Sequence, residues 1–216
     1  MANQQINQYT IERLEFGDDD YYDIDYWNGS AYQTAKIKGS VIKGGMAPGL
    51  FAQTDDGTAV ENTTTETSLL GTGVGTLLIP ADAWIKGQSY HFQVTGVINA
   101  NVNDTLHIRL KSGATQVLSG GATTMFAITG GKYFQYDIYF TCREIGGPGV
   151  GILEGTGTFG RKVDTGSQYR VTSINDTNNT TFTTTGNNTL DITAEWGVAD
   201  PNNRIQSRTA ILKRTY

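Results

Sequence analysis

Hydrophobic and polar residues alternate with a period of two along much of this chain. The clearest case is residues 105–113, where Leu106, Ile108 and Leu110 share one side of an extended backbone and His107, Arg109 and Lys111 share the other. Residues 132–145 and 189–197 show the same alternation. Because successive side chains of a strand point to opposite faces, each segment predicts a strand with one buried and one solvated face.

The predicted buried faces are rich in large side chains. They comprise Phe134, Tyr136, Ile138, Phe140 and Cys142 in the second segment, and Leu190, Ile192, Ala194 and Trp196 in the third. Further strands are predicted at 49–57, 68–79, 89–100, 115–121, 149–162, 168–176 and 207–216. Turn signals containing Gly, Asn, Asp or Pro separate them, and no helix longer than a turn or two is expected. The pattern predicts an all-β protein, an antiparallel jelly-roll β-sandwich.

Residues 1–48 differ in composition from the rest of the chain. They are richer in charge and tyrosine, and Gly44-Gly45 and Pro48-Gly49 follow as a predicted hinge. Residues 22–27 alternate as a strand would, and residues 31–39 can pair with them across Asn28-Gly29. We therefore predict a small N-terminal β segment, 1–48, that serves for attachment, and a jelly-roll head, 49–216.

The segment SLLGTGVGTLLIP, residues 68–80, has glycine at positions 71, 73 and 75. A dinucleotide-binding loop would need a helix directly after the glycines, and a P-loop would need Gly-Lys-Ser/Thr; neither pattern is present. In a strand, by contrast, the three glycines would share one face. We expect the missing side chains to admit an aromatic ring or a neighbouring backbone.

Composition and charge narrow the possible partners. The 216 residues include 16 Lys plus Arg and carry a net charge of −5, which argues against nucleic acid as the main partner. A single cysteine, Cys142, excludes a disulfide within the chain and fits folding in a reducing cytoplasm. The N-terminus has no secretion signal, and no stretch reaches the length of a membrane span. The sequons at Asn62 and Asn179 therefore count as chance matches.

Metal chemistry finds little support in the sequence. The acidic residues Asp18, Asp19, Asp20, Asp23 and Asp25 do not follow the spacing of a calcium-binding loop, so a solvated turn entering a strand is the favoured reading over a cation site. The only histidines, His91 and His107, lie on separate predicted strands without a Cys/His pair at ligand spacing. We predict no metal and no cofactor.

Catalytic patterns are equally sparse. No G-x-S-x-G elbow is present, and Cys142 falls on a buried face, where an inert thiol is expected. Paired carboxylates leave no linear signature, so Glu144, Glu154 and Glu195 stay open as candidates for glycosidase or lyase chemistry. A surface carboxylate such as Glu195 beside a core tryptophan is nevertheless an ordinary arrangement. We predict that the protein is not an enzyme.

Aromatic residues offer two competing interpretations. Trp84, Tyr90, Tyr133, Tyr139 and Tyr169 are candidates for an exposed set that would stack on sugar rings. Tyrosines at sheet ends also fill subunit interfaces. The sequence does not separate these two uses.

Several motifs resemble those of structural proteins from tailed bacteriophages. Residues 63–113 are similar to a module of tail-fibre and appendage proteins, in which a Thr-Glu-Thr strand leads to Leu-Gly-Thr-Gly-Val-Gly, Ile-Pro-Ala and a Leu-x-Ile-Arg-x-Lys-x-Gly strand. Residues 137–159, 178–197 and 202–216 continue the resemblance, which covers about residues 50–216. The segment before it is similar in style to the short acidic linkers that precede such heads.

The resemblance implies a jelly-roll head similar to tumour-necrosis-factor and C1q domains, assembled as a homotrimer. Tyr136, Phe140 and Tyr216 would then be buried against their copies. Residues 1–48 would attach to another virion protein, and the head would bind a host cell-surface glycan or protein through many weak contacts. The expected location is the virion, after synthesis in the host cytoplasm. The alternatives are a capsid decoration or head-fibre protein without a receptor, and a carbohydrate-binding or carbohydrate-active jelly roll.

Overall fold

The computed structural model describes residues 21–27, 32–38, 49–164 and 168–215, the first two ranges by their backbone. Contacts divide the chain into two compact units, Met1–Pro48 and Gly49–Tyr216. In the first unit, strands β1 (Tyr21–Trp27) and β2 (Tyr32–Lys38) form an antiparallel pair with Ile24 opposite Ala35. The pairing predicted for this segment is confirmed.

The second unit is built entirely of strands and their connections in the residues described. The strands are β3 (Gly49–Gln53), β4 (Val60–Glu61), β5 (Thr67–Ser68), β6 (Gly73–Gly75), β7 (Leu78–Ile79), β8 (Ser89–Ala100), β9 (Thr105–Ser112), β10 (Thr115–Thr124), β11 (Ile128–Glu144), β12 (Ile152–Lys162), β13 (Tyr169–Asn178), β14 (Asn188–Trp196) and β15 (Arg204–Arg214). Every pairing between them is antiparallel.

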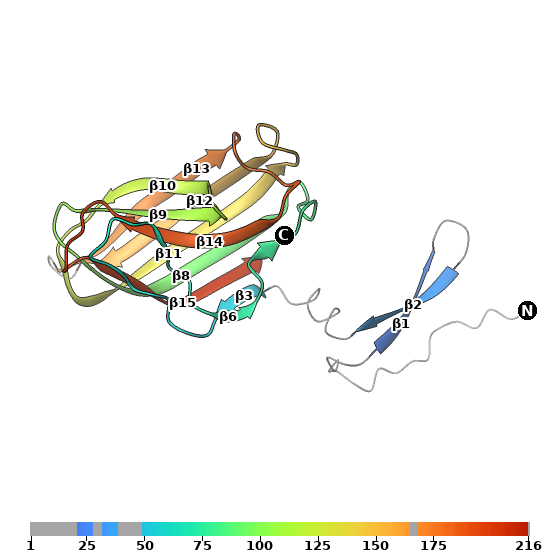
Figure 1. The fold of residues 1–216 in the computed structure, drawn as a ribbon, viewed down its shortest axis with the longest axis horizontal. Coiled ribbons are helices and arrows are strands. Elements are labelled where there is room, and N and C mark those ends of the chain that lie inside the picture. The colour runs from blue at the N-terminus through green and yellow to red at the C-terminus, as the bar shows by residue number, and fades with distance from the viewer. Residues whose placement is uncertain (1–20, 28–31, 39–48, 165–167, 216) are drawn as a thin grey trace, which may run out of the picture. The chain divides into compact units, whose positions relative to one another are not determined.

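These strands form two layers, which Figure 1 shows one in front of the other. The eight-stranded sheet has the order β13-β12-β11-β8-β15-β3-β6, with β4 also paired to β15. The five-stranded sheet has the order β10-β9-β14-β5, with β7 also paired to β14. The chain passes between the sheets at every connection from β4 to β9 and again after β10, β13 and β14, whereas β11, β12 and β13 follow one another within the eight-stranded sheet. The predicted fold class, an all-β antiparallel sandwich, is confirmed.

One hydrophobic cluster fills the space between the sheets. Leu106, Ile108 and Leu110 of β9 are buried in it, as their alternation with charged residues predicts. From the same sheet, Trp196 of β14 is fully buried, and its indole Nε1 donates a hydrogen bond to the Val60 carbonyl at 3.0 Å. A satisfied indole in the core ties the short strand β4 to the sandwich.

The single strand predicted at 68–79 is wrong, because this segment changes sheets. Strands β5 and β7 pair with β14 in one layer, whereas β6 pairs with β3 in the other. The turn needs Gly75, whose φ of +92° is strained for any other residue. The expectation about close packing is confirmed at Gly73, where a Cβ atom would lie 2.6 Å from the Phe51 ring and 2.4 Å from the Ala52 carbonyl oxygen.

Side chains of β13 close one edge of the sandwich by bonding the backbone of β10. Asp176 Oδ2 accepts a hydrogen bond from the Ser119 amide at 2.6 Å, and Asn178 Nδ2 donates to the Gln116 carbonyl at 3.1 Å. Both β10 and β13 are terminal strands of their sheets. Backbone groups of an edge strand are thereby paired across the two layers.

Candidate functional site

The outer face of the eight-stranded sheet carries three exposed tyrosines. Tyr133 and Tyr139 on β11 and Tyr169 on β13 are 46%, 49% and 50% exposed. The alternation that buries Phe134 and Phe140 of β11 directs Tyr133 and Tyr139 to the opposite side. We call these three residues, together with His91, Gln93, Gln135 and Asp137, the tyrosine face.

Asp137 is the centre of a hydrogen-bonded network on this face. Its Oδ2 accepts from Gln93 Nε2 at 2.9 Å and from Gln135 Nε2 at 3.1 Å, while its Oδ1 lies 3.0 Å from His91 Nε2. The side chains of His91 and Asp137 are only 10% and 17% exposed. With three of about four acceptor sites occupied and little exposed surface, the carboxylate orients its neighbours and offers little to a ligand.

The network also positions two of the tyrosines. The rings of His91 and Tyr139 are stacked, with centroids 4.2 Å apart and planes 1° from parallel. The Tyr133 hydroxyl donates to Gln135 Oε1 at 3.2 Å. Rigid aromatic rings fixed on a sheet make a preorganised contact surface.

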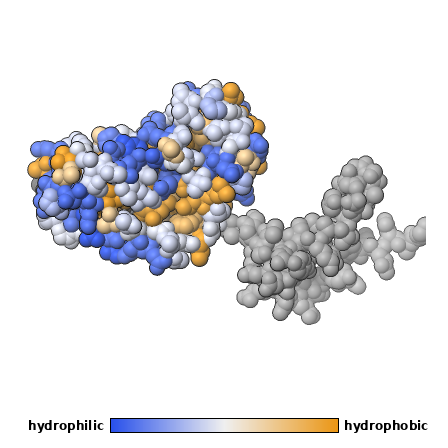
Figure 2. Space-filling view, in the orientation of Figure 1, coloured by the Kyte–Doolittle hydropathy of each residue, from blue (hydrophilic) through white to orange (hydrophobic). Residues whose placement is uncertain are grey.

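Apolar residues extend this surface across the sheet. The register places Val74, Ala52, Ile211, Gln93 and Asp137 side by side on β6, β3, β15, β8 and β11. Val74 is 63% exposed and Ile211 is 44% exposed. Figure 2 views the molecule from the side of the five-stranded sheet and shows a separate gathering of hydrophobic residues over the region of β3, β6 and β14; β14 does not belong to the sheet that carries the tyrosine face. Exposed aromatic and aliphatic residues around a satisfied polar centre are typical of an interface.

The other proposed aromatic residues lie inside the sandwich, which corrects two expectations. Trp84 and Tyr90 are buried in an edge-to-face cluster with Phe182, and burial raises the pKa of Tyr90 to about 12. Tyr136 and Phe140 are each 1% exposed on the inner face of β11, so neither can be buried against another copy. Tyr216 lies outside the described residues. Of the five candidates for an exposed set, only Tyr133, Tyr139 and Tyr169 belong to it.

The three candidate carboxylates for glycosidase chemistry each have a different basic partner. Glu144 pairs with Lys86 at 2.5 Å, and Glu154 pairs with Arg143 at 3.3 Å, both on the eight-stranded sheet side. Glu195, on β14 of the other sheet, pairs with Arg109 at 2.6 Å. Glu154 and Glu195 lie on the outer faces of opposite sheets, with the core between them, so they do not form a catalytic pair.

A charged network covers the outer face of the five-stranded sheet. Glu66 contacts Lys111 at 2.8 Å and Arg109 at 3.3 Å, and the Thr193 hydroxyl donates to it at 2.6 Å. Burial opposes the charge of Glu66, but the hydrogen bonds from Lys111 and Thr193 and the two cations together lower its pKa. Arg109 also contacts the second histidine, His107, at 3.0 Å. The network neutralises itself and leaves no excess charge to attract a ligand.

Cys142 lies in the core, where the sequence predicts an inert thiol. Cys142 is fully buried, and burial, with a smaller contribution from Glu144, raises the pKa of its thiol to about 11, which confirms an unreactive cysteine.

The acidic cluster is described only in part, because Asp18, Asp19 and Asp20 lie outside the described residues. Asp23 and Asp25 lie on β1 opposite Lys36 and Thr34. Within the described part of the chain, no group of three or more His, Cys, Asp or Glu side chains could hold a metal ion.

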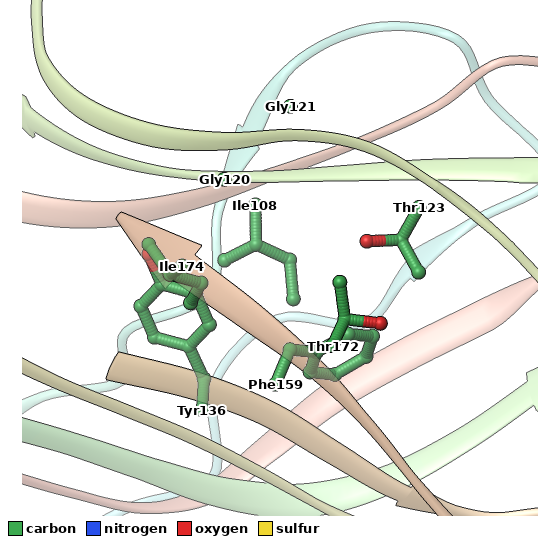
Figure 3. Close-up of a pocket in the computed structure, with 8 residues that line it drawn as sticks. All are labelled: Ile108, Gly120, Gly121, Thr123, Tyr136, Phe159, Thr172 and Ile174. Atoms are coloured by element: carbon green, nitrogen blue, oxygen red, sulfur yellow. The ribbon is translucent and has the colours of Figure 1, made fainter. Parts of the chain in front are cut away.

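A small cavity lies between the sheets beside Tyr136. Its volume is about 10 Å³, enough for one water molecule, and Figure 3 shows Tyr136, Phe159, Ile108 and Ile174 pointing toward one another around it. The Tyr136 hydroxyl is buried without a hydrogen-bond partner among the described residues. Burial, with a smaller contribution from Asp176, raises its pKa far above the usual range.

Sequence reasoning missed the network around Asp137. In the sequence, His91 stands out only as a possible metal ligand, and nothing singles out Asp137. The signal is the register of β8 against β11, which places Gln93 opposite Asp137 and His91 opposite Tyr139. Alternation gives the face of each residue but not its partner on the next strand.

Comparisons with known proteins add no family. No protein-family model matches the chain, and a search of curated proteins gives no match. Among solved structures, the chain is similar to a beta-fructofuranosidase from Schwanniomyces occidentalis complexed with fructosyl-erythritol, at 12% identity and a TM-score of 0.21. The alignment covers 91% of this chain and 40% of that chain. No helix long and apolar enough to cross a membrane occurs in the residues described.

Proposed function

We propose that this protein is a virion structural protein, a trimeric fibre or appendage head of the tailed-bacteriophage type. Residues 49–216 form the head, and residues 1–48 attach it to another virion component. The head contacts the surface of the host cell. The proposal gives the protein no catalytic role, no cofactor and no metal.

The tyrosine face is the observation that carries the proposal. Its rings are half exposed although they are held in place by stacking and by the hydrogen bonds around Asp137. Burying such a surface against a protein is more favourable in free energy than leaving it exposed to water. Three copies related by a closed rotation can cover it without leaving an open-ended contact. The likeness of residues 63–113 to tail-fibre modules supports a trimer, because the resemblance implies a homotrimeric head.

The first test is the solution mass of the full chain. Light scattering at micromolar concentration should give three times the 23.4 kDa of the chain. A species of 23.4 kDa under these conditions contradicts the proposal. Imaging of the intact particle should then show the head on the tail, whereas a position on the capsid would favour the decoration protein.

The role of the N-terminal segment is tested by removing residues 1–48. The shortened protein should still form a trimer, with the mass of three shortened chains, because residues 49–216 form their own compact unit. It should no longer join the particle. A shortened protein that still joins the particle would move the attachment site into the head.

A further inference from the structure

A second surface, distinct from the tyrosine face, lies at the edge where β10 meets β13. A groove of about 580 Å³ is lined there by Thr115 and Gln116 of β10, Asp176, Thr177 and Asn178 of β13, and Thr180 just beyond β13. This volume falls in the range of about 300–1,000 Å³ that is usual for small-molecule sites. Val117 and Thr181 complete the lining, in which every residue except Val117 is polar and none is basic.

Asn178 makes the wall of the groove rigid. It is 9% exposed, and its Oδ1 accepts hydrogen bonds from the amides of Thr180 at 3.2 Å, Thr181 at 3.0 Å and Phe182 at 3.0 Å. Its Nδ2 spans the groove floor to the Gln116 carbonyl. One side chain therefore fixes the segment after β13 against β10, and the groove exists before any ligand arrives.

The remaining polar groups of the groove are available. Thr115, Gln116, Thr177 and Thr180 are exposed residues, and their side chains form no hydrogen bond among the described residues. A second groove of about 360 Å³ differs in this respect. There Asn99 Oδ1 accepts from the Gly131 amide at 2.6 Å, and the Thr129 hydroxyl donates to Asp164 at 2.7 Å.

We propose that the groove between β10 and β13 binds a neutral oligosaccharide. Sugar hydroxyls both donate and accept hydrogen bonds, and threonine hydroxyls and a glutamine amide do the same. The Asp176 carboxylate adds an acceptor and, with no cation in the lining, disfavours sialylated or phosphorylated sugars. The inference rests on the proposed function, in which each trimer presents three grooves and valency multiplies weak binding.

The binding test uses the full chain, labelled with ¹⁵N, and a set of neutral probes. Maltotriose, mannotriose and N-acetylchitotriose are titrated separately, with sialyllactose as the anionic comparison. A neutral trisaccharide should shift the amide signals of 115–117 and 176–181, and sialyllactose should bind more weakly. Absence of such shifts with every neutral probe, or shifts confined to the tyrosine face, overturns the assignment.

Variants then connect the binding to individual hydroxyls. Thr177→Ala and Thr180→Ala should each weaken binding about fivefold, the value of one hydrogen bond. Ser173→Ala, which removes a hydroxyl from the same strand outside the groove, should leave affinity unchanged. Equal effects of all three substitutions overturn the groove as the site. The solution mass, measured on the same samples, reports separately on the trimer, so failure of sugar binding and failure of assembly are distinguishable.

Discussion

At the scale of single residues, Gly73 shows how a missing side chain shapes this sandwich. It lies on β6, where the backbone approaches β3 and the Phe51 ring covers the position that a Cβ atom would take. Neither the ring nor the carbonyl of Ala52 can withdraw without disturbing the edge of the eight-stranded sheet. The close approach therefore depends on glycine.

Replacing Gly73 with valine should lower the free energy of unfolding by about 3 kcal/mol, because an overpacked site forces backbone or ring to move. Denaturant unfolding followed by fluorescence measures the change. Gly147→Ala is the matched control, since no atom lies within 4 Å of its added Cβ, and it should change stability by less than about 0.5 kcal/mol. A valine variant as stable as the control would contradict the packing argument.

Tyr136 presents the opposite case, because its side chain carries a polar group into the core. Its hydroxyl is buried in the core without a partner among the described residues, and such a group pays for desolvation without a hydrogen bond in return. Tyr136→Phe should thus leave stability unchanged or raise it by up to about 1 kcal/mol. Thermal unfolding measures the effect. Destabilisation by Tyr136→Phe would reveal a hydrogen-bonding partner such as a water in the adjoining cavity.

At the scale of elements, the five-stranded sheet places two carboxylates with opposite pH behaviour on its outer face. Glu66 is stabilised as a charge by Lys111 and Thr193, so its pKa lies below its ordinary value of 4.5. Asp191 of β14 has a pKa above its ordinary value of 3.8, because burial outweighs the hydrogen bond from Ser68. Ionisation of Glu66 therefore favours the folded state, and ionisation of Asp191 opposes it.

The two carboxamide variants should accordingly move stability in opposite directions. At pH 7, Glu66→Gln should lower the free energy of unfolding and Asp191→Asn should raise it, each by about 1 kcal/mol or less. The effect of Glu66→Gln should fade as pH falls below 4.5 through the folded pKa, and that of Asp191→Asn should vanish below 3.8. Urea unfolding at pH 7, 5 and 3.5 tests both. Equal signs at pH 7 would refute the assignment.

Most strands could be predicted because their period-two pattern reports directly on burial. The strand at 105–113 is an example, since its apolar residues face the core and its charged residues lie on the outer face, where Arg109 and Lys111 pair with Glu66. The segment at 68–79 failed for a physical reason. A continuous apolar run with glycines fits a buried strand, but a positive φ at Gly75 lets the backbone leave one sheet for the other. Such a turn depends on the tertiary neighbours.

The candidate site was less predictable than the fold. Alternation correctly separates Tyr139 from Phe140, whereas the resemblance to trimeric heads implied that Phe140 would contact another copy, which its burial in the core rules out. The hydrogen bonds of Asp137 depend on which residues of β8 and β11 stand opposite one another, and register is not written in either strand separately. The groove between β10 and β13 depends on how two sheets end, which no local pattern reports.

At the scale of the whole molecule, we expect the proposed association of three heads to depend on the tyrosine face. Tyr139→Glu places a charge among exposed aromatic and aliphatic residues and should convert the trimer to a monomer with the fold intact. Light scattering gives the mass, and circular dichroism reports the fold. Ile85→Glu is the control, because Ile85 is a 66% exposed hydrophobic residue in a loop outside this face. If Tyr139→Glu stays trimeric, the contact lies elsewhere.

The bonds from Asp176 and Asn178 to the backbone of β10 have a consequence for crowding. Sandwich proteins packed closely can recruit a neighbour's strand onto an open edge and grow into fibrils. With the Ser119 amide and the Gln116 carbonyl already occupied, that edge offers fewer places for a foreign strand to join. Many copies can therefore accumulate at high local concentration with less tendency to polymerise through β10.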